Sequence, residues 1–241
     1  MFHITIRNMK NAISLGSDVI QAAADITRDK KIVLFSNIVF TNKEISGKGI
    51  RSFTLDELKA LCRASAGDKP DDDMDGLFPE MDEALKKIKS HRFNLHLSGR
   101  DPELIHKFCD IITDNRAQER VLVSSLAGGT IRKIRGVFPD MATCFPFINA
   151  IGFYALHRSG LLYFKRNFTH DVLIIPERIG ASYLANPGLI KEARSRGIRV
   201  YVLDVIKEEQ VGRLHGNGAD GFVTNYATMV KRAMKQLEGQ S

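Results

Sequence analysis

Short apolar runs alternate with amphipathic stretches along most of the chain, and this alternation limits the possible folds most strongly. Runs rich in leucine and β-branched residues are typical of parallel strands buried on both faces. We expect strands at 18–25, 31–36, 92–97, 120–125, 142–147, 171–176, 199–204 and 220–224. Helical patterns with clear start signals lie at 54–65, 79–91, 101–115 and 186–197. Repeated strand–helix alternation predicts βαβ units and a parallel sheet.

The chain length favours a closed barrel over an open sheet. Seven or eight strand–helix units within 241 residues predict an α/β fold, a (β/α)8 TIM-type barrel that forms a single domain over residues 1–241. One connection differs, because only residues 26–30 separate the first two strands. A parallel crossover needs about a dozen residues, so these two strands should form an antiparallel hairpin near the N-terminus.

Composition and charge exclude several classes of protein. The chain is 44% hydrophobic and 26% charged, which is ordinary for a globular domain. It has no long uncharged apolar run and no signal-peptide core, so we expect a cytoplasmic protein. The three cysteines are scattered, which predicts neither a disulfide framework nor a zinc site. The net charge of +7 favours anionic ligands, but no nucleic-acid module accompanies the basic clusters, so we expect no specific nucleic-acid partner.

In a (β/α)8 barrel the functional side chains lie at the carboxyl ends of the strands. The candidates for acid/base chemistry at these ends are His96, Glu177 and Asp204. The candidates for binding phosphate or another ligand are Arg178, Ser36, Asn37, Ser98 and Ser124. Glu177 and Arg178 could instead simply pair with each other.

Five segments carry a family resemblance through their order and spacing. Residues 16–37 contain a Gly-x-Asp-x-Ile run and a Thr-x-Asp turn before a strand, and residues 46–61 place a Gly-rich turn before Thr-Leu-x-Glu-Leu. Segment 78–85 begins a Pro-led helix, segment 120–143 joins a strand ending in serine to a helix ending in Pro-Asp, and segment 196–230 contains a strand and a Gly-Ala-Asp-Gly run. From about residue 10 onward, the chain resembles the glycerophosphodiester phosphodiesterase family. The resemblance implies a barrel that hydrolyses glycerophosphodiesters with a divalent metal and two catalytic histidines.

The residues at the family's functional positions differ from those that the resemblance implies. Gln21 and Ala23 stand at its metal-binding Glu-x-Asp pair, and Ser36 and Asn37 stand at its His-Asp pair. His96 stands at a metal-binding Glu, and Ser98 stands at the Lys that follows it. The family's first strand, which carries His-Arg-Gly, has no counterpart unless residues 2–6 are a remnant of it. We therefore expect a shortened first βα unit.

These differences predict a catalytically degenerate relative. A hard divalent cation needs charged oxygen ligands, and acid/base cleavage needs two groups that titrate near neutrality. The leading hypothesis is a barrel that binds a partner or a phosphorylated small molecule and uses no cofactor. The alternative is an active phosphodiesterase that uses His96, Glu177, Asp204 and Arg178 in a rewired site, with Ca²⁺ or Mg²⁺ as its cofactor.

A third hypothesis, an oligomeric or membrane-surface scaffold, depends on residues 145–168. This stretch is aromatic and basic, a combination that suits an anionic membrane surface or a partner's groove. It could equally be a barrel helix with its apolar face on the strands. A barrel left imperfectly closed by the shortened start would have an open strand edge, which is a route to a homo-oligomer.

Residues 71–82 match the spacing of an EF-hand calcium loop. The four carboxylates at the ligand positions are Asp71, Asp73, Asp75 and Asp82. Aspartate at the last position is a weaker ligand than the usual glutamate, and Pro79 interrupts the second half of the loop. The segment is interpreted either as a weak Ca²⁺ or Mg²⁺ site or as a solvated acidic loop that caps the following helix.

Overall fold

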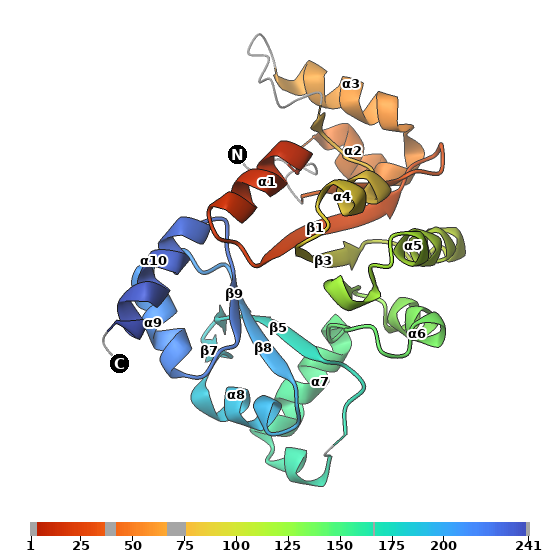
Figure 1. The fold of residues 1–241 in the computed structure, drawn as a ribbon. Coiled ribbons are helices and arrows are strands. Elements are labelled where there is room, and N and C mark those ends of the chain that lie inside the picture. The colour runs from red at the N-terminus through yellow and green to blue at the C-terminus, as the bar shows by residue number, and fades with distance from the viewer. Residues whose placement is uncertain (1–3, 37–41, 67–75, 166, 240–241) are drawn as a thin grey trace. The chain divides into compact units, whose positions relative to one another are not determined.

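The computed structural model describes residues 4–36, 42–66, 76–165 and 167–239 (Figure 1). The chain divides into two compact units, Met1–Met141 and Ala142–Ser241, and each is described by itself. The first unit contains α1 (Ile6–Ser14), β1 (Val19–Ile26), β2 (Ile32–Phe35), α2 (Lys43–Lys48), α3 (Leu55–Ala66), α4 (Met81–Lys87), β3 (Arg92–Leu97), α5 (Pro102–Asp114), β4 (Val121–Ser124) and α6 (Gly128–Val137). The second contains α7 (Phe147–Arg158), β5 (Val172–Pro176), β6 (Arg178–Ile179), β7 (Ser182–Tyr183), α8 (Pro187–Arg194), β8 (Arg199–Leu203), α9 (Glu208–Gly216), β9 (Gly221–Val223) and α10 (Ala227–Glu238).

The sheet of the first unit has the order β2-β1-β3-β4. Strands β1, β3 and β4 are parallel, and α5 lies between β3 and β4 in the chain. Strand β2 pairs with β1 in the antiparallel direction, with Ala23 opposite Phe35 and Ile26 opposite Ile32. The predicted N-terminal hairpin is therefore confirmed.

Both faces of β1 are covered by apolar side chains. Ala22 and Ala24 belong to the main core of this unit, together with residues of α4, α5 and β3. Ala23 points to the opposite face, where it belongs to a second apolar cluster. That cluster contains Val33, Phe35, Ile45, Ile50, Phe53, Leu55, Leu58, Leu77 and Phe78. The hairpin and the segment after it thus build a second core on the other side of the sheet.

The second unit has a parallel sheet of order β5-β8-β9 and a small antiparallel pair, β6-β7. Its core gathers alternate residues of the strands, such as Val200 and Val202, against α7, α8, α9 and α10. Among the parts of the chain that the structure describes, no helix combines the length and the apolar composition that crossing a bilayer requires.

Seven of the eight expected strands are present within one residue or two of their predicted ends. The prediction of a strand over 142–147 is wrong, because that segment makes only an isolated parallel bridge, Cys144 with Val172. Pro146 has no backbone N–H to donate to a ladder, and α7 begins at Phe147. A remnant strand over 2–6 is also not formed at its described end, because Thr5 caps α1 and Ile6 is already helical.

Candidate functional site

Two predicted site residues meet at the carboxyl ends of β3 and β4. The register places His96 directly beside Ser124, and His96 Nδ1 lies 3.1 Å from Ser124 Oγ. Burial lowers the pKa of His96, so its imidazole is uncharged at neutral pH. A neutral imidazole beside a hydroxyl can accept its proton, and the pair can also bind a polar ligand.

The position matched to the family's metal-binding aspartate lies in an apolar environment. Ala23 is the β1 neighbour of His96, yet its side chain is only 8% exposed and packs in the second cluster with Phe35 and Ile50. Two residues earlier, Gln21 Oε1 accepts a hydrogen bond from Asn94 Nδ2 at 3.0 Å. The two β1 positions therefore serve packing and an amide–amide contact.

An arginine that the sequence analysis missed bridges the ends of β1 and β3. Arg51 donates to Asp25 Oδ1 from Nε at 3.0 Å and from Nη2 at 2.9 Å, and Nη1 donates to Asp101 Oδ2 at 3.2 Å. The Asp25 side chain is only 11% exposed, so Arg51 contacts a largely buried carboxylate. A Cβ on Gly99 would lie 1.4 Å from Arg51 Nη2, so the guanidinium lies directly on the Gly99 backbone.

The other ligand-binding candidates of this unit have different surroundings. Ser36 is half-buried just after β2, and Asn37 lies outside the described residues. Ser98 is exposed, and its N–H continues the β1–β3 ladder by donating to Ala24 O at 3.1 Å. Ser98 follows His96 by two residues, so its side chain starts from the same face of the sheet.

In the second unit, Glu177 follows β5 and is held by two residues of α9. Glu177 Oε1 accepts from Arg213 Nη2 at 2.6 Å, and Oε2 accepts from Gln210 Nε2 at 2.7 Å. Partial burial acts to raise the pKa of Glu177, but the hydrogen bonds from Gln210 and Arg213 outweigh it and hold the pKa below its usual range. The carboxylate is therefore ionised and already paired at neutral pH.

The remaining predicted residues of this unit are separate from that pair. Arg178 does not supply the ion pair of Glu177, and its guanidinium lies 5.0 Å from the ring centre of Tyr183. Asp204 is exposed just after β8 and has a left-handed backbone with φ of 57°. Aspartate tolerates this conformation better than most residues. The structure therefore does not bring Glu177, Arg178 and Asp204 together into one hydrogen-bonded group.

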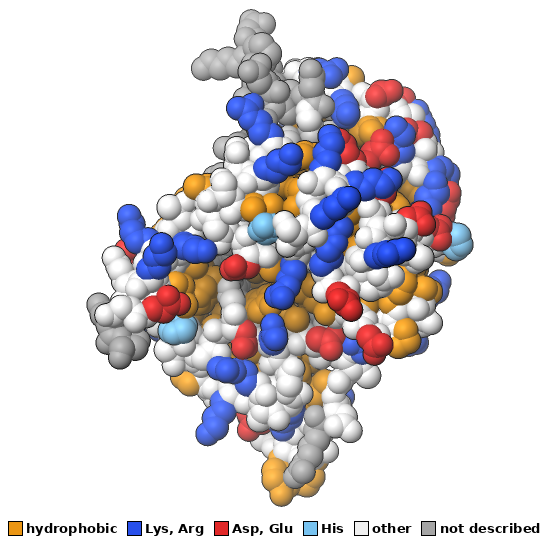
Figure 2. All heavy atoms as spheres, viewed as in Figure 1, with side chains coloured by type: hydrophobic (Ala, Val, Ile, Leu, Met, Phe, Trp, Pro, Cys, Tyr) orange, Lys and Arg blue, Asp and Glu red, His pale blue; other side chains and the backbone are white. Residues whose placement is uncertain are grey.

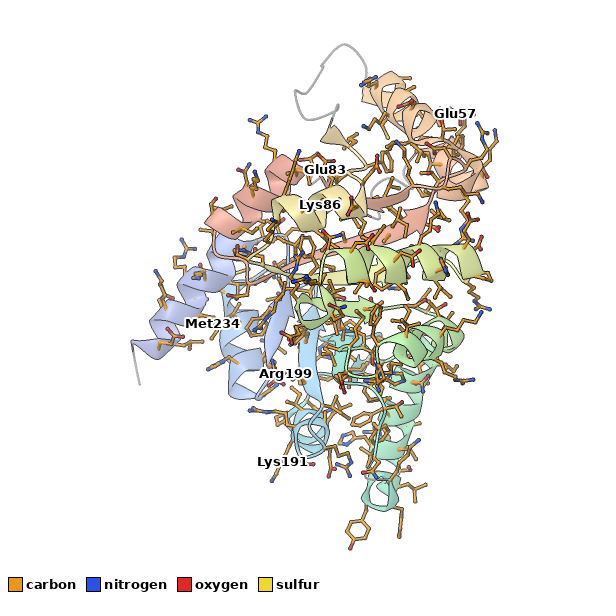
Figure 3. All side chains as sticks on the ribbon, turned by 45° about the vertical axis from the view of Figure 1, so that its right-hand side comes forward. Glu57, Glu83, Lys86, Lys191, Arg199 and Met234 are labelled. Atoms are coloured by element: carbon orange, nitrogen blue, oxygen red, sulfur yellow. The ribbon has the colours of Figure 1, made fainter. Side chains whose placement is uncertain are left out.

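The first part of the expected calcium loop, residues 71–75 with Asp71, Asp73 and Asp75, lies outside the described residues. Asp82 lies in the first turn of α4 and accepts from Lys86 Nζ at 2.6 Å and from Asn115 Nδ2 at 2.8 Å (Lys86 is labelled in Figure 3). The Lys86 hydrogen bond is the main cause that lowers the pKa of Asp82. Within the described ranges, no group of three or more His, Cys, Asp or Glu side chains is placed to hold a metal ion. The calcium site stays a prediction.

The Glu177–Arg213 pair predicts a pH dependence of stability. Because folding lowers the pKa of Glu177, the stabilisation is present above its unfolded pKa and is lost as the pH falls through the folded value. Glu177→Gln should therefore lower the free energy of unfolding by about 1 kcal/mol at pH 7, and the difference from the parent should shrink below about pH 4. Urea unfolding of Glu177→Gln and of the parent at several pH values measures this difference in the free energy of unfolding. Glu44→Gln, which removes an exposed 3.8 Å pair with Lys48, should have little effect at any pH.

Comparisons with known proteins agree with this architecture. The family model "Glycerophosphoryl diester phosphodiesterase family" matches residues 3–229. A glycerophosphodiester phosphodiesterase of Caldanaerobacter subterraneus is 24% identical over 230 residues, which cover 92% of this chain and 87% of the relative.

Solved structures show the same α/β fold. A glycerophosphodiester phosphodiesterase of Parabacteroides distasonis matches with a TM-score of 0.70 at 17% identity, over 98% of this chain and 90% of the other. An Oleispira antarctica phosphodiesterase, solved with its product sn-glycerol-3-phosphate, matches with a TM-score of 0.70 at 16% identity, over 96% and 90%. These relatives are (β/α)8 barrels, and closure of the barrel in this chain stays a prediction. The chain, matched by the family model over nearly its whole length, belongs to the glycerophosphoryl diester phosphodiesterase family.

Proposed function

We propose that this chain is a catalytically degenerate member of the family that binds a phosphorylated small molecule instead of hydrolysing a phosphodiester. The observation that carries the proposal is the burial of Ala23 in an apolar cluster. At this position the family resemblance implies a carboxylate that holds a metal. A methyl group packed against Phe35 and Ile50 has no lone pair to offer, and its surroundings disfavour any charge.

The other residues at the implied metal positions also do not fit a divalent cation. Gln21 offers one neutral amide oxygen, which already accepts a hydrogen bond from Asn94. His96 offers a nitrogen, and its Nδ1 contacts Ser124. Mg²⁺ and Ca²⁺ require several oxygen ligands, most of them charged. The family's metal-assisted reaction therefore has no set of ligands at these three positions.

Arg51 lies at the same edge of the sheet, where it forms ion pairs with two carboxylates, Asp25 and Asp101. These two partners offset the charge of the guanidinium, so the groups left to contact a ligand are the His96 imidazole and the serine hydroxyls. Such groups suit the hydroxyl and phosphate oxygens of a hydroxylated ligand. Further support comes from the Oleispira antarctica relative, whose structure contains sn-glycerol-3-phosphate.

The contact between His96 and Ser124 favours one alternative, a rewired enzyme. In that alternative His96 accepts the proton of Ser124 Oγ, the oxygen attacks phosphorus, and His96 returns the proton to the departing alcohol. A water that gives a proton to His96 then attacks the phosphorus and releases Ser124, with His96 returning that proton to Oγ. Such an enzyme would work without a metal. His96→Ala and Ser124→Ala would each abolish turnover while leaving thermal unfolding unchanged, and this combination would favour the alternative over the degenerate protein.

The proposed function is tested by measuring glycerol 3-phosphate release from glycerophosphodiesters that differ in their alcohol, with Mg²⁺, Ca²⁺, Mn²⁺ or EDTA. We expect no release above the no-protein background under any of these conditions. In parallel, sn-glycerol-3-phosphate should raise the unfolding temperature equally with Mg²⁺ and with EDTA, because its binding does not need a metal. Metal-dependent release would contradict the proposal, and so would the absence of any shift with glycerol 3-phosphate. Glycerol without phosphate is the control ligand.

A further inference from the structure

The connection between α7 and β5 carries an exposed apolar turn that the proposed function does not use. This turn, which we call the aromatic tip, is the short 3₁₀ helix Leu161–Phe164. Tyr163 is 71% exposed and Phe164 is 81% exposed, whereas Leu162 between them and the core is buried. The turn lies at the lower end of the second unit in Figure 1, and Figure 2 shows hydrophobic side chains gathered there. Exposed apolar side chains that cluster in this way mark a contact surface more often than scattered ones do.

The aromatic tip is held in place by Arg196, whose side chain is only 10% exposed. Arg196 Nη2 donates to the carbonyl of Leu162 at 2.8 Å, and Nε donates to the carbonyl of Lys165 at 3.2 Å. The same guanidinium pairs with the Glu192 carboxylate. Because the largely buried Arg196 donates to two backbone carbonyls of the turn, it fixes the backbone of the turn. The rings of Tyr163 and Phe164 are therefore held on the surface by the fold.

Aromatic packing supports the same conclusion. The rings of Tyr163 and Phe164 meet edge to face, with centroids 5.4 Å apart. Behind them, Phe168 packs against Phe153 and Phe145 at centroid distances of 5.1 and 5.8 Å. The inner rings thus anchor the connection in the core, while the outer two remain exposed as a rigid pair.

Two cations flank the aromatic tip along the chain. Arg158 ends α7 just before it, and Lys165 follows it with Nζ 5.0 Å from the ring centre of Phe168. Lys191 on α8 and Arg199 at the start of β8, both labelled in Figure 3, are further exposed cations of the same unit. The carboxylate of Glu192 is paired with Arg196, so it does not cancel these charges. The two exposed rings are therefore flanked along the chain by Arg158 and Lys165, in a unit with further exposed cations.

We propose that the aromatic tip is a membrane-surface anchor that inserts Tyr163 and Phe164 into the interfacial layer of an anionic bilayer. Aromatic side chains favour that layer, and flanking lysine and arginine are attracted to anionic headgroups. A second copy of this chain fits less well, because a stable protein interface uses about 20–30 residues on each side and the tip offers one turn. The tip precedes β5 whereas Glu177 follows it, so the anchor lies at the opposite end of this strand from Glu177.

The absence of tryptophan from the chain gives a direct test. Phe164→Trp creates a single fluorescent reporter at the aromatic tip, and Ile148→Trp places one at a 70% exposed site on α7. With vesicles of phosphatidylcholine containing about 30% phosphatidylglycerol, the Phe164→Trp emission should shift to the blue and resist quenching by acrylamide. With phosphatidylcholine alone the shift should be much smaller. The Ile148→Trp emission should change little with either vesicle.

Flotation of the unlabelled protein with the same vesicles provides the second measurement. Tyr163→Ser/Phe164→Ser should reduce the vesicle-bound fraction by about tenfold or more, whereas Ile148→Ser should not. Circular dichroism and the unfolding temperature show whether each variant is folded.

The proposal is overturned if the parent protein does not bind anionic vesicles, or if the double variant binds them equally well. It is also overturned if light scattering shows a lipid-free dimer that the double variant loses, because the tip would then be a self-association surface. Neither measurement depends on hydrolysis or glycerol 3-phosphate binding.

Discussion

Substitution of Ala23 by aspartate is expected to lower the free energy of unfolding by about 3 kcal/mol or more, and to create no site for a divalent cation. The new carboxylate would start from a position that is 8% exposed and surrounded by Val33, Phe35 and Ile50. Burying a carboxylate among apolar side chains is strongly destabilising, and the adjacent His96 is itself largely buried. The same substitution would restore a metal ligand if the family's site had survived in this chain.

Urea unfolding of Ala23→Asp in EDTA and in excess Mg²⁺ or Mn²⁺ separates these two outcomes. If the position is an apolar packing site, the loss of stability is the same with and without metal. Ala23→Asn, which adds a similar volume without the charge, should cost less than Ala23→Asp, and Ala155→Asp on the exposed side of α7 should cost almost nothing. A metal-dependent recovery of stability by Ala23→Asp would contradict the degenerate assignment.

Replacing Arg51 by methionine is expected to have the next largest effect, a loss of about 2–4 kcal/mol in the free energy of unfolding. The substitution leaves the Asp25 carboxylate, whose side chain is 11% exposed, without the guanidinium that it contacts at 2.9 Å. Gly99→Ala should change stability in the same direction, because its new Cβ would displace Arg51 Nη2.

Two further variants serve as controls for Arg51→Met. Arg28→Met removes an ion pair with Glu57 whose partners are 55% and 47% exposed, so it should cost no more than about 1 kcal/mol. Asp25→Asn combined with Arg51→Met removes both charges and should recover part of the loss. If Arg51→Met and Arg28→Met lower the free energy of unfolding equally, the ion pair between Arg51 and Asp25 at the end of β1 does not contribute specially to stability.

Much of the fold follows from local patterns in the sequence, and the exceptions have identifiable physical causes. The hairpin was predictable because residues 26–30 are too few for a parallel crossover. The strand expected at 142–147 failed because its hydrophobicity matched a strand while Pro146 prevented a continuous ladder. Hydrophobicity alone does not reveal a missing donor in the middle of a run.

Only those residues of the candidate site that lie near the carboxyl ends of strands could be predicted from the sequence. His96 and Ser124 each end a predicted strand, and the parallel register brings them together. Arg51 gave no comparable signal, because its partner Asp25 lies 26 residues earlier and the ion pair forms only when the turn after α2 folds onto β1. The burial of Ala23 was hidden for the same reason, since the cluster that covers it comes from segments distant in sequence.

The alanine run at 22–24 also bears on how this lineage can change. Ala22 and Ala24 face one core and Ala23 faces the other, so β1 separates two apolar layers that approach each other closely. A metal ligand at this position would require a carboxylate at residue 23 and, simultaneously, the opening of the second layer that Phe35 and Ile50 fill. A carboxylate introduced without that opening is expected to lower the stability. The second core therefore makes alanine at residue 23 much easier for evolution to retain than to replace with a charged residue.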